Sequence, residues 1–397
     1  SFFYPSIGLS AILTSMFNAP DWLTYLKVRG SYTEVGNSYG RFMTTVTYPY
    51  DEQTQSWTST SSYPNTKLKP ERTKSWEVGL DARILNDISL NLTYYRSNTY
   101  NQTFYADLSL SSGYSNIPIQ SGNIMNEGLE MSLGYNKQWK DFSFNTNYTL
   151  TWNKNRVKRL ADGVYNYATG QPIQMPELSP LTYGHTDARL ILRVGGSMGD
   201  VYGQRLLKRD LNGYILNEEG VGLAMENKET YLGSILPKMN MGWSLGFGYK
   251  GVNLGMTFTG RFGGIVISET QSVLDAAGVS KVSADVRDAG GVQINQSKVS
   301  AQTYYQTIQG TAAYYTYSAT NVRLGELSLS YTLPKKWFDN KVGMTVGLVG
   351  KNLWMIYCKA PFDPELTTSA ASNFYQGFDA YMLPSTRNFG FNVKFQF

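Results

Sequence analysis

The chain closes with Arg-Asn-Phe-Gly-Phe-Asn-Val-Lys-Phe-Gln-Phe, residues 387–397, and this stretch decides the predicted fold. Successive side chains of a β-strand point to opposite faces, so one face of this segment is apolar and the other is polar. A strand that has lipid on one side and water on the other requires that pattern. The stretch therefore predicts a closing strand of a membrane β-barrel whose apolar face consists of Phe389, Phe391, Val393, Phe395 and Phe397.

The same alternation recurs along the whole chain and predicts about eleven antiparallel strands. Short turns and long excursions alternate between them, as in outer-membrane barrels with short periplasmic turns and long extracellular loops. Strand-like pieces near 41–48 and 200–216 are assigned to loops, and the region 157–237 reads as irregular. The expected extracellular loops lie at about 37–73, 107–122, 157–237, 263–318 and 358–382.

The strand count also bears on completeness. Bacterial barrels of one chain have an even number of strands, and the chain opens inside an alternating pattern, without an initiating Met. We therefore expect residues 1–397 to be the C-terminal part of a larger barrel. The final residue, Phe397, is expected at the periplasmic end.

The composition supports a β-rich membrane protein. Charged residues make up 16% of the chain and aromatic residues 14%, with 30 Tyr and 38 Gly. Such a composition suits many strands with amphipathic aromatic belts and does not suit a helical protein. The net charge of +5 includes one dense basic cluster, Lys154, Arg156, Lys158 and Arg159, which we interpret as a solvated strand end rather than a nucleic-acid site.

The tryptophans predict two interfacial girdles, because an indole ring is apolar and its N–H needs a polar partner. Three lie at or beside the short turns and four lie near the ends of strands that enter long loops. The alternative is that Trp is simply common at strand ends. The girdle residues are Trp22, Trp139 and Trp337 at one end and Trp76, Trp152, Trp243 and Trp354 at the other.

Signatures of catalysis are absent from the sequence: there is no nucleophile elbow, phosphate loop or zinc-protease motif. Cys358 and His185 are the only Cys and His, so they cannot build a Cys/His zinc site, and a nucleophilic pair of the two is less plausible than a strand-end Cys and a loop His. Asp363-Pro-Glu365 brings two carboxylates close together; an acid/base pair or Ca²⁺ ligands are possible, but a structural or gating loop motif is favoured. We predict no enzyme and no cofactor or metal.

Aromatic side chains in the long loops are the candidate substrate contacts. Their faces can stack on sugar rings or hold peptide side chains, although packing inside large ordered loops is the alternative for each one. Tyr167 and Phe378 share this setting. The candidates are Trp57, Tyr114, Tyr165, Tyr304, Tyr305, Tyr314, Tyr315, Phe374 and Tyr375.

An ordered set of motifs carries a family resemblance. They are Leu68-Lys-Pro-Glu-Arg-Thr-Lys-Ser-Trp-Glu-Val-Gly-Leu80, Gly122-Asn-Ile-Met-Asn-Glu-Gly-Leu-Glu130, Ala319-Thr-Asn-Val-Arg-Leu-Gly-Glu-Leu-Ser-Leu-Ser-Tyr331, Gly350-Lys-Asn-Leu-Trp354 with Asp363-Pro-Glu365, and Pro384-Ser-Thr-Arg-Asn-Phe-Gly-Phe391. Together they resemble the C-terminal half of the SusC/RagA-like TonB-linked outer-membrane transporters of Bacteroidota.

The resemblance implies a fold and a set of partners. It implies a barrel of 22 strands with an N-terminal plug, of which the plug and TonB-contacting segment are not in this chain. It also implies a SusD-like surface lipoprotein lid, TonB, outer-membrane lipid, and import of oligosaccharides or oligopeptides. A dimer of the transporter–lipoprotein pair, a Gram-negative outer-membrane location and the absence of nucleic-acid binding are further expectations.

Two other classes of protein remain open at this point. A passive outer-membrane porin would need no plug. A soluble carbohydrate-binding β protein would stay monodisperse without detergent. The residues do not choose between a glycan and a peptide as substrate.

Overall fold

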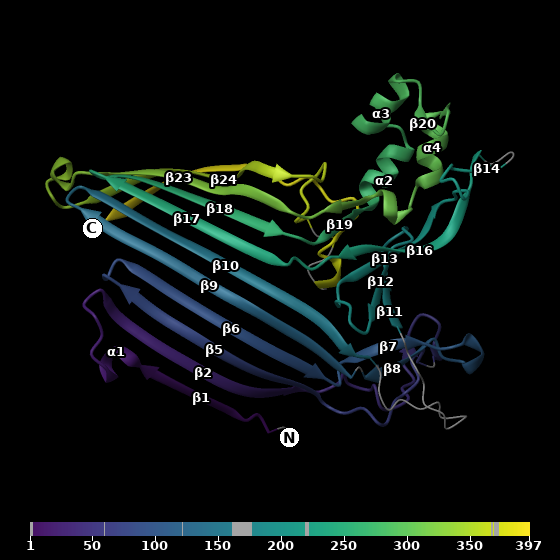
Figure 1. Ribbon diagram of the computed structural model, residues 1–397, viewed down its shortest axis with the longest axis horizontal. Coiled ribbons are helices and arrows are strands. Elements are labelled where there is room, and N and C mark those ends of the chain that lie inside the picture. Colours follow the sequence, from purple (N-terminus) through teal and green to yellow (C-terminus); the bar gives the residue numbers. More distant parts are fainter. Residues whose placement is uncertain are drawn as a thin grey trace.

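A single curved sheet of eleven strands, called here the wall sheet, dominates the molecule (Figure 1). The computed structural model describes residues 3–58, 60–120, 122–160, 177–218, 222–366, 368 and 373–397. The strands of the wall sheet are β1 (Ser6–Ile12), β2 (Leu23–Asn37), β5 (Glu71–Ile84), β6 (Ile88–Tyr100), β9 (Asn123–Trp139), β10 (Phe142–Arg159), β17 (Met239–Tyr249), β18 (Val252–Phe262), β23 (Asn321–Leu333), β24 (Gly343–Cys358) and β26 (Asn388–Gln396).

The wall strands follow one another in chain order, and each pairs antiparallel with the next. This confirms the predicted partial barrel of about eleven strands. β1 and β26 are the two edges of the sheet. Most wall strands are longer than the roughly 9–11 residues that a tilted strand needs to cross a bilayer; β10, for example, has 18.

The pairing register sorts the side chains onto two faces. Leu80 lies opposite Leu92, Leu92 opposite Met131, and Met131 opposite Leu150, so apolar side chains form rows that cross strands. We call this side the apolar face. The intervening residues, such as Thr93 and Glu130, which lie opposite each other, form the polar face. Two-residue periodicity in each strand is what produces this separation.

Short turns join the strands at one end, on the left of Figure 1. Tyr249 pairs with Val252, leaving Lys250 and Gly251 as a two-residue turn with φ of 45° and 90°. Positive φ at both positions is required by the hairpin turn whose twist matches the strands, and glycine adopts it without strain. The first and fifth turns are longer and contain α1 (Leu13–Met16) and the 3-10 helix η3 (Lys335–Phe338).

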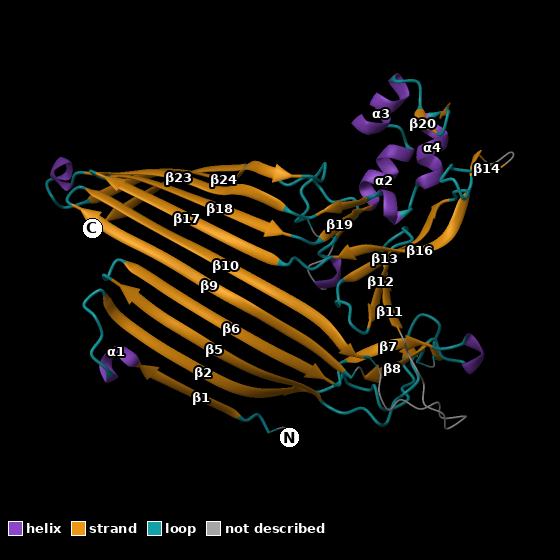
Figure 2. Cartoon of the chain, in the orientation of Figure 1, coloured by secondary structure: helices purple, strands orange, loops and turns teal. Residues whose placement is uncertain are grey.

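All five long excursions lie at the opposite end of the wall sheet (Figure 2). We call the described parts of these excursions the loop assembly. The first three contain β3 (Tyr50–Asp51), β4 (Ser56–Trp57), β7 (Thr103–Asp107), η1 (Leu110–Ser112), β8 (Asn116–Gln120), β11 (Glu177–Thr182), β12 (Arg189–Arg193), β13 (Asp200–Leu207), β14 (Asn217–Glu218), β15 (Gly222–Leu223) and β16 (Met225–Ser234). The last two contain β19 (Ile265–Ser268), α2 (Glu269–Ala276), α3 (Lys281–Asp288), β20 (Val292–Ile294), β21 (Ser297–Val299), α4 (Ala301–Ile308), η2 (Ala312–Tyr314), β22 (Thr316–Ser318), η4 (Asn373–Tyr375) and β25 (Phe378–Asp379).

Two expectations about the loops are corrected. The region 157–237 is not irregular: β11, β12, β13 and β16 form a second sheet of four strands, and β13 accounts for the strand-like piece near 200–216. The piece near 41–48 contains turns and no strand, and the β3–β4 hairpin follows it at 50–57. These strands are short and their alternation is interrupted, so periodicity alone did not reveal them.

Helices in the excursion 263–318 were not predicted. Each of the three begins after a serine whose hydroxyl accepts a backbone N–H: Ser268 from Gln271 at 2.9 Å, Ser280 from Ser283 at 3.0 Å and Ser300 from Thr303 at 3.1 Å. Serine at the N-cap was the available signal. Helices of eight residues are marginal alone and depend here on packing. In the described part of the chain, no helix is long and apolar enough to cross a membrane.

Candidate functional site

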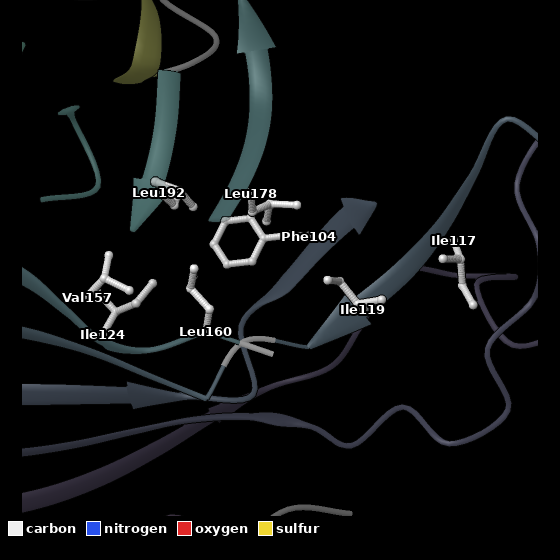
Figure 3. Close-up of a cluster of buried hydrophobic side chains, with 8 residues drawn as sticks. All are labelled: Phe104, Ile117, Ile119, Ile124, Val157, Leu160, Leu178 and Leu192. Carbon is white, nitrogen blue, oxygen red and sulfur yellow. The ribbon is translucent and has the colours of Figure 1, made fainter. Parts of the chain in front are cut away.

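Three buried apolar clusters make the loop assembly one packed body. The first joins the loop ends of β9 and β10 to β7, β8, β11 and β12 (Figure 3). Val157 and Leu192 are fully buried in it, and Ile124 is 1% exposed. The excursions 101–122 and 160–238 are therefore fixed to each other and to the wall strands. The members are Phe104, Ile117, Ile119, Ile124, Val157, Leu160, Leu178 and Leu192.

The second cluster joins three excursions. Its buried members include Tyr183 from the excursion 160–238, Ile267 from 263–320 and Phe378 from 359–387. The ring centroids of Tyr183 and Phe378 are 5.2 Å apart, and the Tyr183 hydroxyl donates to the Phe374 carbonyl at 2.7 Å. Phe374 and Tyr375, both candidate substrate contacts, are half-buried against this cluster.

The third cluster contains four of the candidate tyrosines. Tyr305 and Tyr315 are buried, and Tyr304 and Tyr314 pack against them half-buried. The Tyr314 hydroxyl accepts the Leu207 N–H at 3.1 Å. The expected substrate contacts at Tyr305 and Tyr315 are therefore corrected: these rings fill a core within the loop assembly, as large ordered loops require. Burial also raises the pKa of Tyr315 well above its usual range.

The remaining aromatic candidates have different surroundings. Trp57 is 71% exposed, and its ring lies 5.1 Å from that of Tyr50. Tyr114 is half-buried and meets Tyr63 edge to face at 5.1 Å. Tyr165 and Tyr167 lie outside the described residues. Trp57 is thus the most accessible of the described candidates.

Two buried carboxylates tie the excursions together through hydrogen bonds. Asp187 accepts the backbone N–H groups of Gln204 and Arg205, at 3.0 and 2.7 Å, and that of Ala312 at 2.6 Å. Glu269, 3% exposed, accepts the N–H of His185 and the Tyr381 hydroxyl, each at 3.3 Å. Carboxylates held by several donors give buried loop backbone the partners it would otherwise lack. Sequence reasoning missed both, because isolated acidic residues in loops carry no local pattern.

Asp363 and Glu365 make structural contacts with β23. The sequence favoured a structural or gating loop motif at these residues. The Arg323 guanidinium donates to both carboxylate oxygens of Asp363, at 3.0 and 2.8 Å, and lies 3.4 Å from Glu365. Asn321, which is fully buried, donates to Glu365 at 3.0 Å. Two motifs of the sequence, 319–331 and 363–365, therefore meet and fix the excursion 359–387 to the base of β23. Within the described part of the chain, no group of three His, Cys, Asp or Glu residues is placed to hold a metal ion.

The single Cys and the single His have separate partners. The Cys358 thiol donates to the carbonyl groups of Ala360 and Phe362, at 3.5 and 3.7 Å. His185 is held through its backbone by Glu269. Burial raises the pKa of the Cys358 thiol, which disfavours the thiolate that nucleophilic chemistry needs.

Two cavities lie in or beside the loop assembly. One, of about 500 Å³, opens beside β10 where its pairing with β17 ends at Trp152; Asp200 and Tyr231 line it, and burial raises the pKa of Asp200. The second, of about 490 Å³, lies among the three helices. Both volumes are in the range of small-molecule sites. The residues lining the second cavity are Asp275, Ala276, Ala277, Gly278, Ser283, Arg287, Ser300, Ala301, Gln302, Tyr305 and Gln306.

Comparisons with known proteins agree on the family. A family model described as TonB dependent receptor-like, beta-barrel, matches residues 1–353. TonB-dependent receptor P3 of Formosa agariphila is 25% identical over 432 residues, which cover 99% of this chain and 42% of that protein. TonB-dependent receptor SusC of Bacteroides thetaiotaomicron is 27% identical over 154 residues, covering 38% of this chain and 14% of the relative. The chain thus spans about two-fifths of the length of P3.

A solved structure has the same fold. The RagAB peptide importer in its closed-closed state superposes with a TM-score of 0.70 at 19% identity, covering 99% of this chain and 43% of the importer chain. The same importer in the open-open state gives a TM-score of 0.69 at 20% identity.

Proposed function

Because the chain belongs to the TonB-dependent receptor-like β-barrel family, we propose that it is the C-terminal wall and loop region of a barrel that imports large nutrients across the outer membrane. The observation that carries the proposal is the arrangement of the wall sheet. One of its faces is apolar and the other polar, and all long excursions lie at one end. A polar-lined passage with an elaborated mouth follows from that arrangement.

The loop assembly is the proposed region of substrate capture. It is packed by three apolar clusters and by buried carboxylates, so it can hold binding groups in fixed positions. The described candidates that keep exposed or half-exposed side chains are Trp57, Tyr114, Tyr304, Tyr314, Phe374 and Tyr375. Oligosaccharides and oligopeptides both fit this set of aromatic and polar groups.

The partners follow from the same proposal. A SusD-like lipoprotein would cover the mouth at the loop assembly, and TonB would supply energy through the part of the protein outside this chain. A dimer of the transporter–lipoprotein pair and an outer-membrane location in a Bacteroidota species complete it. The family is one of receptors and transporters, and we propose no catalytic step.

We also propose that the tryptophans form two girdles at the membrane–water boundaries, with the wall strands crossing the membrane between them. Trp22 and Trp337 are exposed beside the short turns, at 52% and 62%. Trp354 is 60% exposed on the loop half of β24, and Trp243 donates its indole N–H to Thr146 at 2.9 Å. Exposed indoles near both ends of the strands suit two membrane–water boundaries.

A deletion tests this function. In the full-length transporter, replacing 263–318 by a Gly-Ser linker should abolish uptake of a labelled oligosaccharide or oligopeptide. The heat-modifiable mobility of the folded barrel should persist, because the wall strands do not depend on that excursion for pairing. A control deletion of the exposed tip 211–213 should leave uptake near the wild-type rate. Unchanged uptake after the 263–318 deletion would contradict the loop assignment, and uptake that survives a proton uncoupler would favour a passive porin.

A further inference from the structure

Basic side chains gather at the loop end of the apolar face, on β5, β6 and β10, with β9 between the last two. We call Arg72, Lys74, Arg96, Lys154 and Arg156 the basic patch. The pairing register places them in adjoining rows. One row runs from Lys154 through Glu127 to Arg96. The next runs from Arg156 through Met125 and Asn98 to Lys74. Because paired strands lie about 4.8 Å apart, the patch extends roughly 15 Å across the sheet.

The two-residue alternation along each strand places the basic patch on the same side of the sheet as the apolar rows. Lys154 and Arg156 follow Leu150 and Trp152 at two-residue steps along β10, and Lys74 and Arg72 precede Trp76 in the same way along β5. Residues two apart share a face of a strand. The patch is therefore a direct continuation of the apolar face and not part of the polar face.

The patch also lies at a defined height. The span from Phe142, at the turn end of β10, to Trp152 matches the roughly 9–11 residues that cross the hydrocarbon of a bilayer. Lys154 and Arg156 come next along the strand. On β5 the equivalent span starts at Ile84 and the same count ends at Lys74, so Lys74 lies at the edge of the hydrocarbon and Arg72 lies beyond it. The cations thus stand at the level of the lipid headgroups.

The patch has an excess of positive charge. Lys74 lies 3.0 Å from Glu34, Arg72 lies 3.9 Å from Glu34, and Lys154 lies 3.9 Å from Glu127. Five cations against two carboxylates leave a surplus of three charges. Among the described residues, no ion pair involves Arg96 or Arg156. The side chains of Arg72, Lys74 and Lys154 remain 53%, 45% and 48% exposed.

The loop end of the apolar face is not basic on every wall strand. Further round the sheet, the loop end of the same face on β18 carries Gly260 and Phe262. At the turn end, the cation Lys137 is bonded to Asp87.

A cavity adjoins the patch. Lys154 and Arg156 line the space of about 500 Å³ that opens where β10 and β17 separate beyond the Trp152–Met239 pair, and Lys238 lines it from the other side. Guanidinium and ammonium groups that line a cavity can bind phosphate oxygens through charge-assisted hydrogen bonds.

From these observations we propose that the basic patch binds the phosphorylated headgroup of a lipid in the leaflet that faces the loop assembly. The lipid's acyl chains would lie along the apolar face, and its phosphate would lie among Arg96, Lys154 and Arg156. The continuity of the apolar rows with the cations favours a lipid over a soluble anion, because only a lipid satisfies both surfaces. The inference rests on the membrane orientation of the proposed function.

Lipid retention by the full-length transporter tests the inference. The protein is reconstituted in nanodiscs of phosphatidylcholine doped with phosphatidic acid, extracted in mild detergent and weighed by native mass spectrometry. Each cation near a headgroup contributes about a fivefold gain in binding, so the variant R96Q/K154Q/R156Q, which removes three, should retain phosphatidic acid about a hundredfold less than the wild type. The control K228Q/K281Q/R287Q removes three exposed cations from the loop assembly and should retain it as the wild type does.

Four results would overturn the inference. The first is that the triple variant retains as much phosphatidic acid as the wild type, and the second is that the control variant loses as much as the triple variant. The third is that the wild type retains phosphatidylcholine as well as phosphatidic acid, and the fourth is that inorganic phosphate at the concentration of the lipid releases the lipid. Heat-modifiable mobility confirms that each variant is a folded barrel. Detergent dependence of the wild type tests the membrane orientation separately, so failure of that premise is distinguishable from failure of the patch.

Discussion

At the scale of single residues, the contact between Arg323 and Asp363 offers the sharpest test. Both side chains are about one-tenth exposed, so removal of the Asp363 charge leaves a buried guanidinium with only the more distant and more exposed Glu365 as a charge partner. Asp363→Asn should destabilise the excursion 359–387 by about 3–5 kcal/mol. Faster hydrogen exchange at 373–387 would report it. The control Glu365→Gln removes a more exposed charge and should cost about 1 kcal/mol or less; equal effects of the two variants would contradict the assigned roles.

The same contact predicts a pH dependence. Burial alone would raise the pKa of Asp363, but hydrogen bonds from Arg323 and from the Glu365 N–H hold it below its usual range. A carboxyl whose folded pKa lies below the unfolded value of about 3.9 contributes stability above that value and loses it as the pH falls through the folded pKa. Protection of 373–387 should therefore fall below about pH 4 in the wild type, whereas Asp363→Asn should lack this step.

At Gly184, both the lack of room for a Cβ atom and the positive φ angle favour glycine. Its φ is 50°, and an added Cβ would collide with Glu269 and lie 2.8 Å from the Phe378 ring. Gly184→Ala should destabilise the loop assembly by about 2–4 kcal/mol, from overpacking and left-handed strain together. Gly195, with φ of 90°, has no atom within 4 Å of such a Cβ, so Gly195→Ala should cost only about 1–2 kcal/mol. Protease cleavage of the loops under native conditions measures both, and similar rates would refute the packing argument.

At the scale of elements, the four-stranded sheet of the loop assembly should respond independently of the wall. Leu190 in β12 is fully buried in the second cluster, so Leu190→Ala should cost about 2–5 kcal/mol. Hydrogen exchange should quicken in β11, β12 and β13 while β17 and β18 keep their protection. Leu211, which is fully exposed, gives the matched control. Loss of protection in the wall strands as well would mean that wall and loops unfold as one unit.

At the scale of the whole molecule, the two faces of the wall sheet should differ in access to water. In a Cys358→Ser background, Ser330→Cys on the polar face should react with a water-soluble maleimide in bilayers. Leu329→Cys, its neighbour on the apolar face, should stay protected, because its side chain would point into lipid. In detergent-free aggregates the contrast should disappear. Equal labelling of both positions in bilayers would contradict the membrane orientation.

Some candidate residues were readable from sequence and others were not. Arg323 and Asp363 stood out in separate motifs, yet 40 residues separate them and nothing local predicts their contact. The tyrosines at 304, 305, 314 and 315 read as ligand contacts because a loop rich in Tyr can serve either purpose. Packing of the third cluster decided the matter for Tyr305 and Tyr315 by burying both.

By itself, the sequence determined the wall: the strands, their order, their two faces and the division into short turns and long excursions. Two-residue periodicity is a local property of each strand, so the sequence of a strand shows its two faces. Because each wall strand pairs antiparallel with the next one in the chain, the order of the strands in the sheet follows directly from their order in the sequence. Only the tertiary structure decided what the excursions do. Their small sheets, capped helices and buried carboxylates depend on contacts between segments as distant as Tyr183 and Phe374. Such contacts produce no repeating pattern in the sequence. Each is an isolated tertiary contact that forms only when the wall sheet has brought the bases of the loops together.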